Sequence, residues 1–214
     1  MGQNPSGISK TKPGREIIRL CIFLFMEDFF EEIERYYTLS EACKNEFAGL
    51  LKNRFISKND FLIRAGETPV SYAFVSKGLF SYYFTSENGD LVIKKFFAEH
   101  ALIASTSALI ENRPGIFSIC ALEDSTVLIF NNQEYRKLMH KYPELAFFHI
   151  AYLEKNWVVK KEPLEISLKY ETAAARYQKF RQEYQQIESR LKLHQIASFL
   201  GITPTQLSRI RKRM

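Results

Sequence analysis

Apolar positions follow a helical spacing near the N-terminus and again over the last third of the chain, with short alternating runs between them. The N-terminal part predicts helices over 27–37 and 41–53. From residue 55 to residue 130 the apolar runs are short, and turn signals return about every 8–12 residues. Regular short strands with glycine turns indicate a β-barrel, roll or sandwich. The expected strands are 61–63, 73–75, 79–84, 91–97, 116–121 and 126–130, with the clearest hairpin turn at Asn88-Gly89-Asp90.

After residue 131 the spacing of apolar positions again predicts helices, over 133–140, 143–161 and 171–184. The helix at 143–161 carries two adjacent apolar stripes, which predicts contacts with two surfaces, its own β-domain and a partner subunit. A helix packed entirely within one core is the alternative that the pattern leaves open. Pro163 is expected to kink or end this helix. The stripe assigned to the dimer helix is Leu145, Phe148, Tyr152 and Val159, and the adjacent stripe is Phe147, Ala151 and Val158.

The last 24 residues, 191–214, predict two short amphipathic helices with a tight turn between them. Gly201 supplies the left-handed residue that ends the first helix. Thr203 is the expected N-cap of the second helix, Pro204 takes its first position, and Gln206 completes a Thr-x-x-Gln capping box. This is the pattern of a helix-turn-helix, whose second helix enters the major groove of DNA. An ordinary helical hairpin is the alternative, and the basic outer face of the second helix argues against it.

The formal net charge of +6 is concentrated at one end of the chain. Residues 1–162 hold 20 Lys and Arg and 20 Asp and Glu, whereas residues 163–214 hold 10 and 4. A basic segment attached to a neutral one indicates a polyanionic partner for the basic segment alone. Double-stranded DNA is therefore the expected partner, and a solubilising tail is the alternative.

The three cysteines are Cys21, Cys43 and Cys120, which are widely spaced and form no CxxC motif. This spacing argues against a disulfide framework and for a reducing compartment, so we expect a cytoplasmic location. Residues 1–25 are expected to be a disordered or non-native extension, with the natural domain starting at Met26. The apolar run 17–26 loosely resembles a signal peptide, but Arg19 interrupts it and it is too short to span a bilayer, so no membrane partner is expected.

The order of these elements, together with several short motifs, resembles the Crp/Fnr family of bacterial transcription regulators over residues 26–214. The most specific stretches are Arg176-Tyr177 and the block from Ile196 to Arg211, which resembles that of family members from Bacteroidetes. Weaker matches in the β-region are Phe61-Leu62-Ile63-Arg64-Ala65-Gly66-Glu67, Val75-Ser76-Lys77-Gly78-Leu79, Asn88-Gly89-Asp90 and Ala121-Leu122-Glu123-Asp124.

The resemblance implies an α+β fold with three parts. These are an N-terminal β-roll like the cyclic-nucleotide-binding jelly roll, a long dimerisation helix, and a C-terminal helical, winged helix-turn-helix domain. The β-roll sensor domain is expected over 26–142, the dimerisation helix and hinge over 143–168, and the DNA-binding domain over 169–214. The resemblance also implies a homodimer on a pseudo-palindromic promoter site, with RNA polymerase as a further partner.

In the family's pattern the first turns of the second helix reach the base edges of DNA. Arg209 is the best candidate for direct readout, because a guanidinium can bond both O6 and N7 of guanine. Thr203 and Gln206 lie at the helix N-terminus, where they suit a phosphate. His194, on the first helix, is expected to be structural or to face phosphate. The predicted DNA-binding residues are Thr203, Pro204, Thr205, Gln206, Ser208, Arg209, Arg211, Lys212 and Arg213, the last three assigned to backbone phosphate.

The β-roll departs from the family's cyclic-nucleotide pattern. Ala104 and Ser105 stand where a Gly-Glu pair holds the ribose in nucleotide-binding members, and no arginine follows at Gly115 and Ile116 to hold the cyclic phosphate. A buried phosphate without a guanidinium would be poorly compensated, so we expect no binding of cyclic AMP. The roll then binds an unknown, less polar effector, or none. The candidate pocket residues are Phe97, Leu102, Ile103, Ala104, Ser105, Gly115 and Ile116.

Sequence signatures of catalysis are lacking: the chain has no HExxH, GxSxG or P-loop motif and no paired Cys/His arrangement. We therefore expect neither an enzyme, nor a cofactor, nor a metal site. The predicted function is that of a dimeric DNA-binding transcriptional regulator with a degenerate cyclic-nucleotide pocket. The alternative is an effector-sensing or dimerisation module that responds to a different small ligand and binds DNA weakly.

Overall fold

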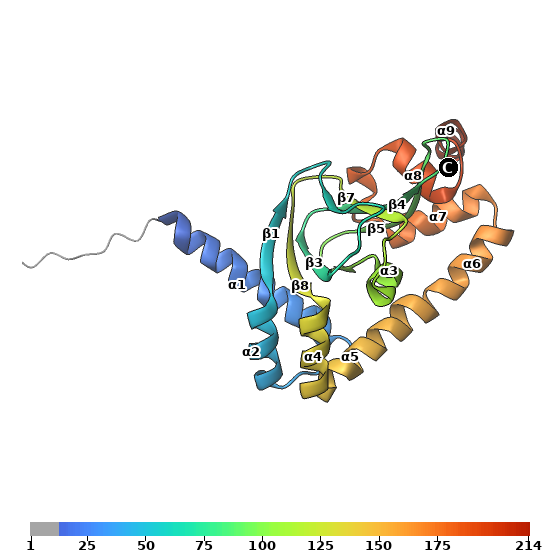
Figure 1. Ribbon diagram of the computed structural model, residues 1–214. Coiled ribbons are helices and arrows are strands. Elements are labelled where there is room, and N and C mark those ends of the chain that lie inside the picture. Colours follow the sequence, from blue (N-terminus) through green and yellow to red (C-terminus); the bar gives the residue numbers. More distant parts are fainter. Residues whose placement is uncertain (1–12) are drawn as a thin grey trace, which may run out of the picture.

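The computed structural model describes residues 13–214, without the side chains of residues 13–23, 164, 165 and 168. A β-roll lies at the centre, with helices α1, α2 and α4 at one end and α7, α8 and α9 at the other (Figure 1). A long helical segment that contains α5 and α6 runs diagonally past the roll and connects the two ends. The helices at the first end are α1 (Pro13–Glu34), α2 (Glu41–Leu50) and α4 (Asn132–Lys141).

The β-roll consists of two four-stranded antiparallel sheets. The predicted strands are confirmed to within two residues at each end. Strands β1 and β6 and the short helix α3 (Thr106–Glu111) were not predicted. The first sheet has the order β1 (Lys52–Ile56), β8 (Ser125–Asn131), β3 (Ser71–Lys77) and β6 (Leu102–Ile103), and the second has the order β2 (Phe61–Ile63), β7 (Phe117–Ala121), β4 (Phe80–Thr85) and β5 (Leu91–Phe97).

Alternation along the strands separates two apolar layers. Val75 and Val127 point between the two sheets, whereas their neighbours Phe74 and Leu128 point to the outer face of the first sheet. That outer face is covered by the first-end helices, which contribute the fully buried side chain of Phe29 from α1 and others. The central strands β3 and β8 of the first sheet are therefore buried on both sides, whereas β1 is largely exposed, and the helices are part of the same domain as the roll.

The N-terminal segment differs from the expectation. Residues 13–25 are helical and belong to α1, which differs from the expected disorder, while residues 1–12 lie outside the described residues. Pro13 opens the helix, a position where its missing N–H costs nothing. Phe25 and Met26 pack against the core that Phe29 and Ile33 enter, so the folded part starts before Met26. Among the described residues, no helix combines the length and the apolar character needed to cross a bilayer.

The long helical segment consists of α5 (Pro143–Leu153), the π-helical turn η1 (Glu154–Val159) and α6 (Lys161–Tyr170). Of the two expected effects of Pro163, a kink or an end of the helix, the second does not occur, because Pro163 lies in the first turn of α6, where a proline is tolerated. The widened turn η1 lies directly upstream, where Pro163 cannot donate to the carbonyl four residues before it. The segment ends at Glu171, whose backbone is extended, three residues beyond the predicted boundary at 168.

The stripe assigned to the dimer helix faces this chain's own roll. Leu145 and Phe148 are 0% and 3% exposed in the core, and the Tyr152 hydroxyl donates to the Leu102 carbonyl at 3.2 Å. Of the four predicted residues, only Val159 is exposed. The assignment of the other three to a dimer interface is therefore wrong. Seven of the large apolar side chains described for the long helical segment are exposed, and Trp157 and Tyr170 are two of them. The other five, called the exposed apolar face below, are Phe147, Ile150, Val158, Val159 and Ile166.

The C-terminal part is helical throughout. No strand follows Asn131 in the described part of the chain, so the predicted wing is not among its elements. The chain turns back after Tyr170, and the last helices pack onto the second sheet of the roll beside β5 (Figure 1). These helices are α7 (Ala173–Glu183), the 3-10 turn η2 (Glu188–Arg190), α8 (Leu193–Leu200) and α9 (Pro204–Arg213).

Candidate nucleic-acid interface and effector cavity

The turn between α8 and α9 has the predicted geometry. Gly201 is left-handed, with φ of 67°, and the Ile202 N–H donates to the Ala197 carbonyl at 3.0 Å. At the start of α9 the Gln206 N–H donates to the Thr203 hydroxyl at 3.2 Å, and the Thr203 N–H donates to the Gln206 side chain at 2.9 Å. The capping box inferred from the sequence is thus confirmed, and it fixes where α9 begins.

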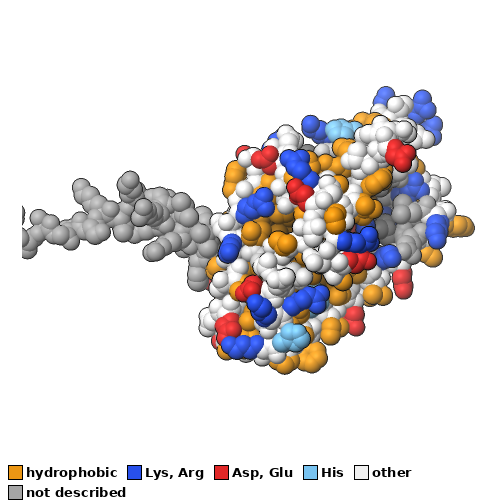
Figure 2. Space-filling model, in the orientation of Figure 1, with side chains coloured by type: hydrophobic (Ala, Val, Ile, Leu, Met, Phe, Trp, Pro, Cys, Tyr) orange, Lys and Arg blue, Asp and Glu red, His pale blue; other side chains and the backbone are white. Residues whose placement is uncertain are grey.

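Helix α9 presents a polar, basic surface to solvent. Its inner side is held by Leu207, which is 0% exposed among Ile196, Ala197 and Leu200 of α8. Lys and Arg side chains gather at the end of the molecule where α9 lies (Figure 2). The exposed predicted residues are Thr203, Pro204, Thr205, Gln206, Arg209, Arg211, Lys212 and Arg213, while Ser208 is half-buried and His194 is exposed on α8.

Arg211 is engaged within the protein. Its Nε donates to the Tyr177 hydroxyl at 2.9 Å, and its guanidinium donates to Glu188 at 3.2 Å. Tyr177 also donates to Glu188, at 2.6 Å. Arg211 therefore ties α9 to the preceding helices, a role that the assignment to phosphate did not include.

Arg176, beside Tyr177 in the same motif, joins two further elements. Its guanidinium donates to the Glu171 carbonyl at 2.7 Å and to the Leu200 carbonyl at 3.1 Å. The first bond closes the turn before α7, and the second satisfies a free carbonyl at the C-terminal end of α8. The Arg176-Tyr177 motif therefore has a physical role: Arg176 fixes the end of α8, and Tyr177 binds Arg211 of α9.

The C-terminal helices are attached to the roll by a charged cluster at η2. Arg190 donates to both oxygens of Glu99, at 2.9 and 3.0 Å, and also binds Glu123. Burial raises the pKa of Glu99, but the bonds from Arg190 and the Gly78 N–H outweigh this and lower it to about 2. The bidentate geometry makes this a strong, directional contact between the two parts of the chain.

A second attachment joins α8 to the outer strand of the second sheet. Ser198 accepts a hydrogen bond from the Ile93 N–H at 3.0 Å and donates to the Leu91 carbonyl. Beside it, Phe96 of β5 contacts Phe199 of α8 and Tyr184, with ring centroids 5.6 and 5.9 Å apart. The helix pair therefore lies directly on the β-roll.

A cavity of about 580 Å³ lies where the roll, the long helical segment and the C-terminal helices meet. We call it the junction cavity. Its walls are mainly aromatic and apolar, and four lysines also line it. Members of the lining from the three parts include Tyr82, Lys94, Lys95, Phe97 and Phe117 of the roll, Tyr152, Asn156, Trp157, Lys160 and Lys161 of the long segment, and Glu183, Tyr184, Ser198, Phe199 and Gly201 of the C-terminal helices.

The predicted effector residues divide into two groups. Phe97, Leu102, Ile103 and Ala104 line the junction cavity. The others do not line it, because Gly115 packs against the buried Ser105 and Ile116 is 63% exposed on the surface. The lysines and Trp157 were not predicted.

The cationic side chains that line the junction cavity are lysines. No arginine is among the side chains described as lining it. Arg113, the nearest candidate in the sequence, is 67% exposed and paired with Glu111. No guanidinium of the described lining can therefore hold a phosphate in the bidentate manner.

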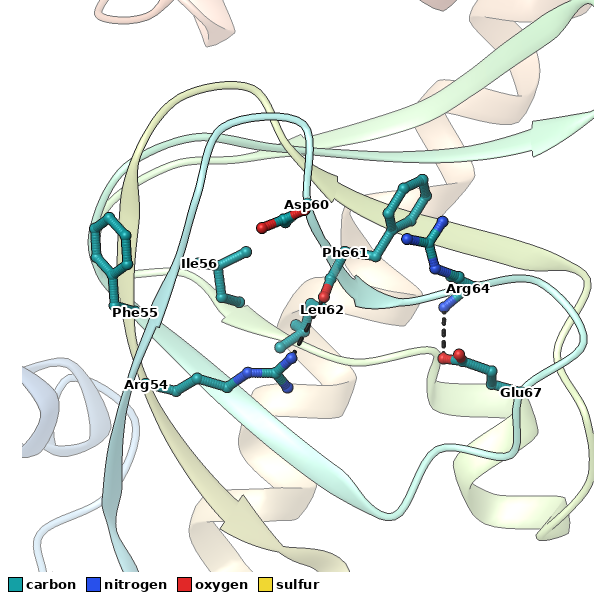
Figure 3. A pocket seen from close by; sticks show the side chains of 8 residues that line it. All are labelled: Arg54, Phe55, Ile56, Asp60, Phe61, Leu62, Arg64 and Glu67. Atoms are coloured by element: carbon teal, nitrogen blue, oxygen red, sulfur yellow. Dashed lines mark hydrogen bonds between the residues drawn. The ribbon is translucent and has the colours of Figure 1, made fainter.

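A smaller open hollow of about 410 Å³ lies at β1 and β2 (Figure 3). The Arg64 guanidinium lies 3.7 Å from the centre of the Phe61 ring, and the Arg64 N–H donates to Glu67 at 2.9 Å. Two arginines and two carboxylates line this hollow, so its charges balance. It therefore has no excess charge that would attract a charged ligand. Within the described residues, no group of three or more His, Cys, Asp or Glu could hold a metal ion.

A sequence model described as the cyclic nucleotide-binding domain matches residues 53–142. The match begins in β1 and ends after α4, so it covers the β-roll with α3 and α4. The comparison with curated protein sequences finds no match.

Solved structures extend the similarity to the C-terminal helices. The chain is similar to the catabolite activator protein of Thermus thermophilus, with a TM-score of 0.54 and 17% identity over 83% of this chain and 84% of that one. For FixK2 from Bradyrhizobium japonicum the TM-score is 0.65 and the identity 15%, over 76% and 83%. For the c-di-GMP responsive regulator CLP of Xanthomonas campestris they are 0.65 and 11%, over 81% and 91%. The chain therefore shares the fold of Crp/Fnr-type regulators: a jelly roll followed by several helices.

Proposed function

We propose that this protein is a DNA-binding transcriptional regulator in which α8 and α9 form a helix-turn-helix and α9 enters the major groove. The observation that carries the proposal is the exposed basic surface of a capped, rigidly held α9. Arg209 lies on that surface in the second turn of α9, where a side chain can reach base edges. Arg211 acts as a positioning residue, since it is bound to Tyr177 and Glu188.

The proposed active form is a homodimer that binds two half-sites of a promoter and acts on RNA polymerase. The exposed apolar face of the long helical segment supports this, because such side chains gain stability when a partner covers them. A second copy related by a two-fold axis would place two α9 helices on the same side of the DNA. Phe147 and Ile150 are the residues that we assign to the centre of this interface.

The β-roll is proposed to have lost cyclic AMP as its effector. Two observations support this proposal. No arginine is among the described cavity residues, and Ala104 and Ser105 stand where the family's nucleotide-binding pattern has Gly and Glu. Micromolar cyclic AMP should then leave the thermal midpoint unchanged, whereas a ligand at 100 times its Kd would stabilise the protein by about 2.7 kcal/mol.

The test is selection of bound DNA from a genomic library, followed by titration of the selected site and of random DNA. Arg209→Ala should lose about 1–3 kcal/mol on the selected site and relax one base position. Lys212→Ala should weaken both DNAs alike and reduce the salt dependence. Arg113→Ala, an exposed arginine on the roll, is the control and should change neither.

An equal loss on both DNAs for Arg209→Ala would contradict its role in readout. Failure to enrich any sequence, with shallow salt dependence, would instead favour the alternative of a sensing or dimerisation module with weak DNA binding.

A further inference from the structure

The junction cavity has aromatic walls drawn from three separate parts of the chain. Tyr82 and Phe117 belong to the second sheet, Trp157 to η1 and Phe199 to α8. Its volume of about 580 Å³ lies within the range of pockets that hold small organic ligands. A cavity with such walls favours a ligand with an apolar body.

Two adjacent lysines of β5 reach this cavity because the strand is irregular. Tyr82 pairs with Lys95 and Tyr83 pairs with Ile93, so Lys94 is an extra residue in β5. Side chains of a regular strand point to alternate faces, whereas a bulge re-aims one of them. Both Lys94 and Lys95 therefore line the same cavity.

Their ammonium groups lie among aromatic rings. The Lys94 Nζ atom is 4.8 Å from the centre of the Phe117 ring and 5.8 Å from that of Trp157. The Lys95 Nζ atom is 5.2 Å from the centre of the Phe97 ring. Lys94 is exposed and Lys95 is half-buried, so these positive charges lie beside the aromatic walls, where an anionic group of a ligand would meet them.

The described lining of the cavity contains more lysines than carboxylates. Four lysines line it, since Lys160 and Lys161 join the two of β5, and Glu183 is the one carboxylate among the described lining residues. Burial lowers the pKa of both Lys94 and Lys95, and neighbouring lysines lower each further. An anion bound beside them would offset this repulsion.

We propose that the junction cavity binds an amphipathic organic carboxylate, with its apolar body against the aromatic walls and its carboxylate at Lys94 and Lys95. Lysine ammonium groups act as point charges, which suits a single carboxylate at the edge of an apolar body. The carboxylate would be the effector of the regulator proposed above, and its effect on DNA binding rests on that proposed function. The ligand would touch Tyr184 and Phe199 as well as the roll, so its binding would change how the C-terminal helices sit on β5.

Trp157 provides a direct readout, because it is the single tryptophan of the chain and it lines the cavity. The probes are micromolar dodecanoate, dodecanol and dodecyltrimethylammonium, which share one apolar chain and differ in charge. Dodecanoate should change the Trp157 fluorescence saturably, with an affinity at least about tenfold above those of the other two. Equal affinity for the three probes, or no saturable change with dodecanoate, overturns the proposal.

Variants separate the charge from the apolar contact. Lys95→Met keeps an apolar side chain of similar length and should weaken dodecanoate about tenfold while leaving dodecanol unchanged. Lys137→Met, an exposed lysine of α4, is the matched control and should leave all three probes unchanged. If Lys95→Met weakened the binding of dodecanoate and of dodecanol equally, the cause would be a packing defect, and the placement of the carboxylate at Lys95 would be overturned.

The regulatory step is tested with the selected DNA site in the presence and absence of dodecanoate. A change in DNA affinity of about fivefold or more, lost in Lys95→Met, supports the proposal. A saturable Trp157 response in a protein that selects no DNA rejects the proposed function and leaves the cavity assignment standing. Specific DNA binding without any Trp157 response rejects the cavity assignment and leaves the function standing.

Discussion

Replacing Arg190 with methionine removes the guanidinium that holds the C-terminal helices to the β-roll, while a side chain of similar length remains. In the intact protein this group donates to both oxygens of Glu99, at 2.9 and 3.0 Å, and binds Glu123. The variant leaves two neighbouring carboxylates without their shared cation. We therefore expect α8 to dock less tightly on β5.

The magnitude follows from Glu99. Burial raises its pKa, but the bonds from Arg190 and Gly78 prevail, so the pKa is about 2 instead of 4.5. For a shielded group, such a lowering corresponds to about 3 kcal/mol at neutral pH. The Glu99 side chain is 32% exposed, so solvent screening reduces this value, and the Gly78 N–H supplies part of it. We expect Arg190→Met to cost about 1–2 kcal/mol.

The pH dependence has a definite sign. Because the pKa of Glu99 is lower in the folded protein, its stabilisation is present above pH 4.5 and is lost as the pH falls toward about 2. The difference in free energy of unfolding between the wild type and Arg190→Met should therefore be constant near neutral pH. It should shrink once the pH falls below about 4.5.

Hydrogen exchange at the Ile93 amide measures the docking, since that N–H donates to Ser198 of α8 at 3.0 Å. In Arg190→Met this amide should exchange about tenfold faster, while the Val127 amide in the first sheet stays protected. Arg35→Met, which removes an exposed pair with Glu32, is the control and should leave both rates unchanged. Unchanged protection at Ile93 in Arg190→Met would refute the reasoning.

Three further substitutions test separate features. Gly78→Ala should destabilise the protein by about 2–4 kcal/mol in urea unfolding, because φ is 116° and an added Cβ would lie 2.1 Å from the Ser125 hydroxyl; Gly89→Ala, with open space, should cost only about 1 kcal/mol. Lys95→Met should raise the thermal midpoint of the ligand-free protein by about 2–4 °C. Burial lowers the pKa of this lysine in the folded state, so its charge is unfavourable there at neutral pH. A lower midpoint would contradict this. Thr203→Ala should cost about 1 kcal/mol by removing the N-cap of α9, and Thr203→Ser should restore it; equal loss in both would exclude capping as the cause.

The sequence predicted those features that depend on neighbouring residues. Alternation located six strands, and the caps at Gly201 and Thr203 located the α8–α9 turn, because the groups that make these bonds are within a few residues of one another. Strand β6 has two residues and no room for an alternation signal. The start of β1 at Lys52 is determined by pairing with β8, far along the chain, which overrides the local helical pattern.

Features that depend on distant contacts could not be predicted in the same way. The sequence analysis assigned the stripe that contains Leu145 and Phe148 to the dimer interface, and only the fold shows that these two residues face the roll while Phe147 is exposed. The part of the junction cavity formed by β5 and the long helical segment was missed for the same reason, because these two elements meet only in three dimensions. A usable signal was the pair Lys94-Lys95 in the middle of a predicted strand, where two adjacent charges cannot both lie on one exposed face unless the strand is irregular.

Strand β5 is the last strand of its sheet, and α8 occupies its free side through the Ser198 contacts with Leu91 and Ile93. A free strand edge readily pairs with another chain. The helix pair therefore protects the roll from self-association, and any state that lifts α8 away uncovers a template for strand addition. We expect the isolated roll to aggregate in a way that the whole chain does not, so the segment proposed to read DNA also prevents strand pairing at that edge of the roll.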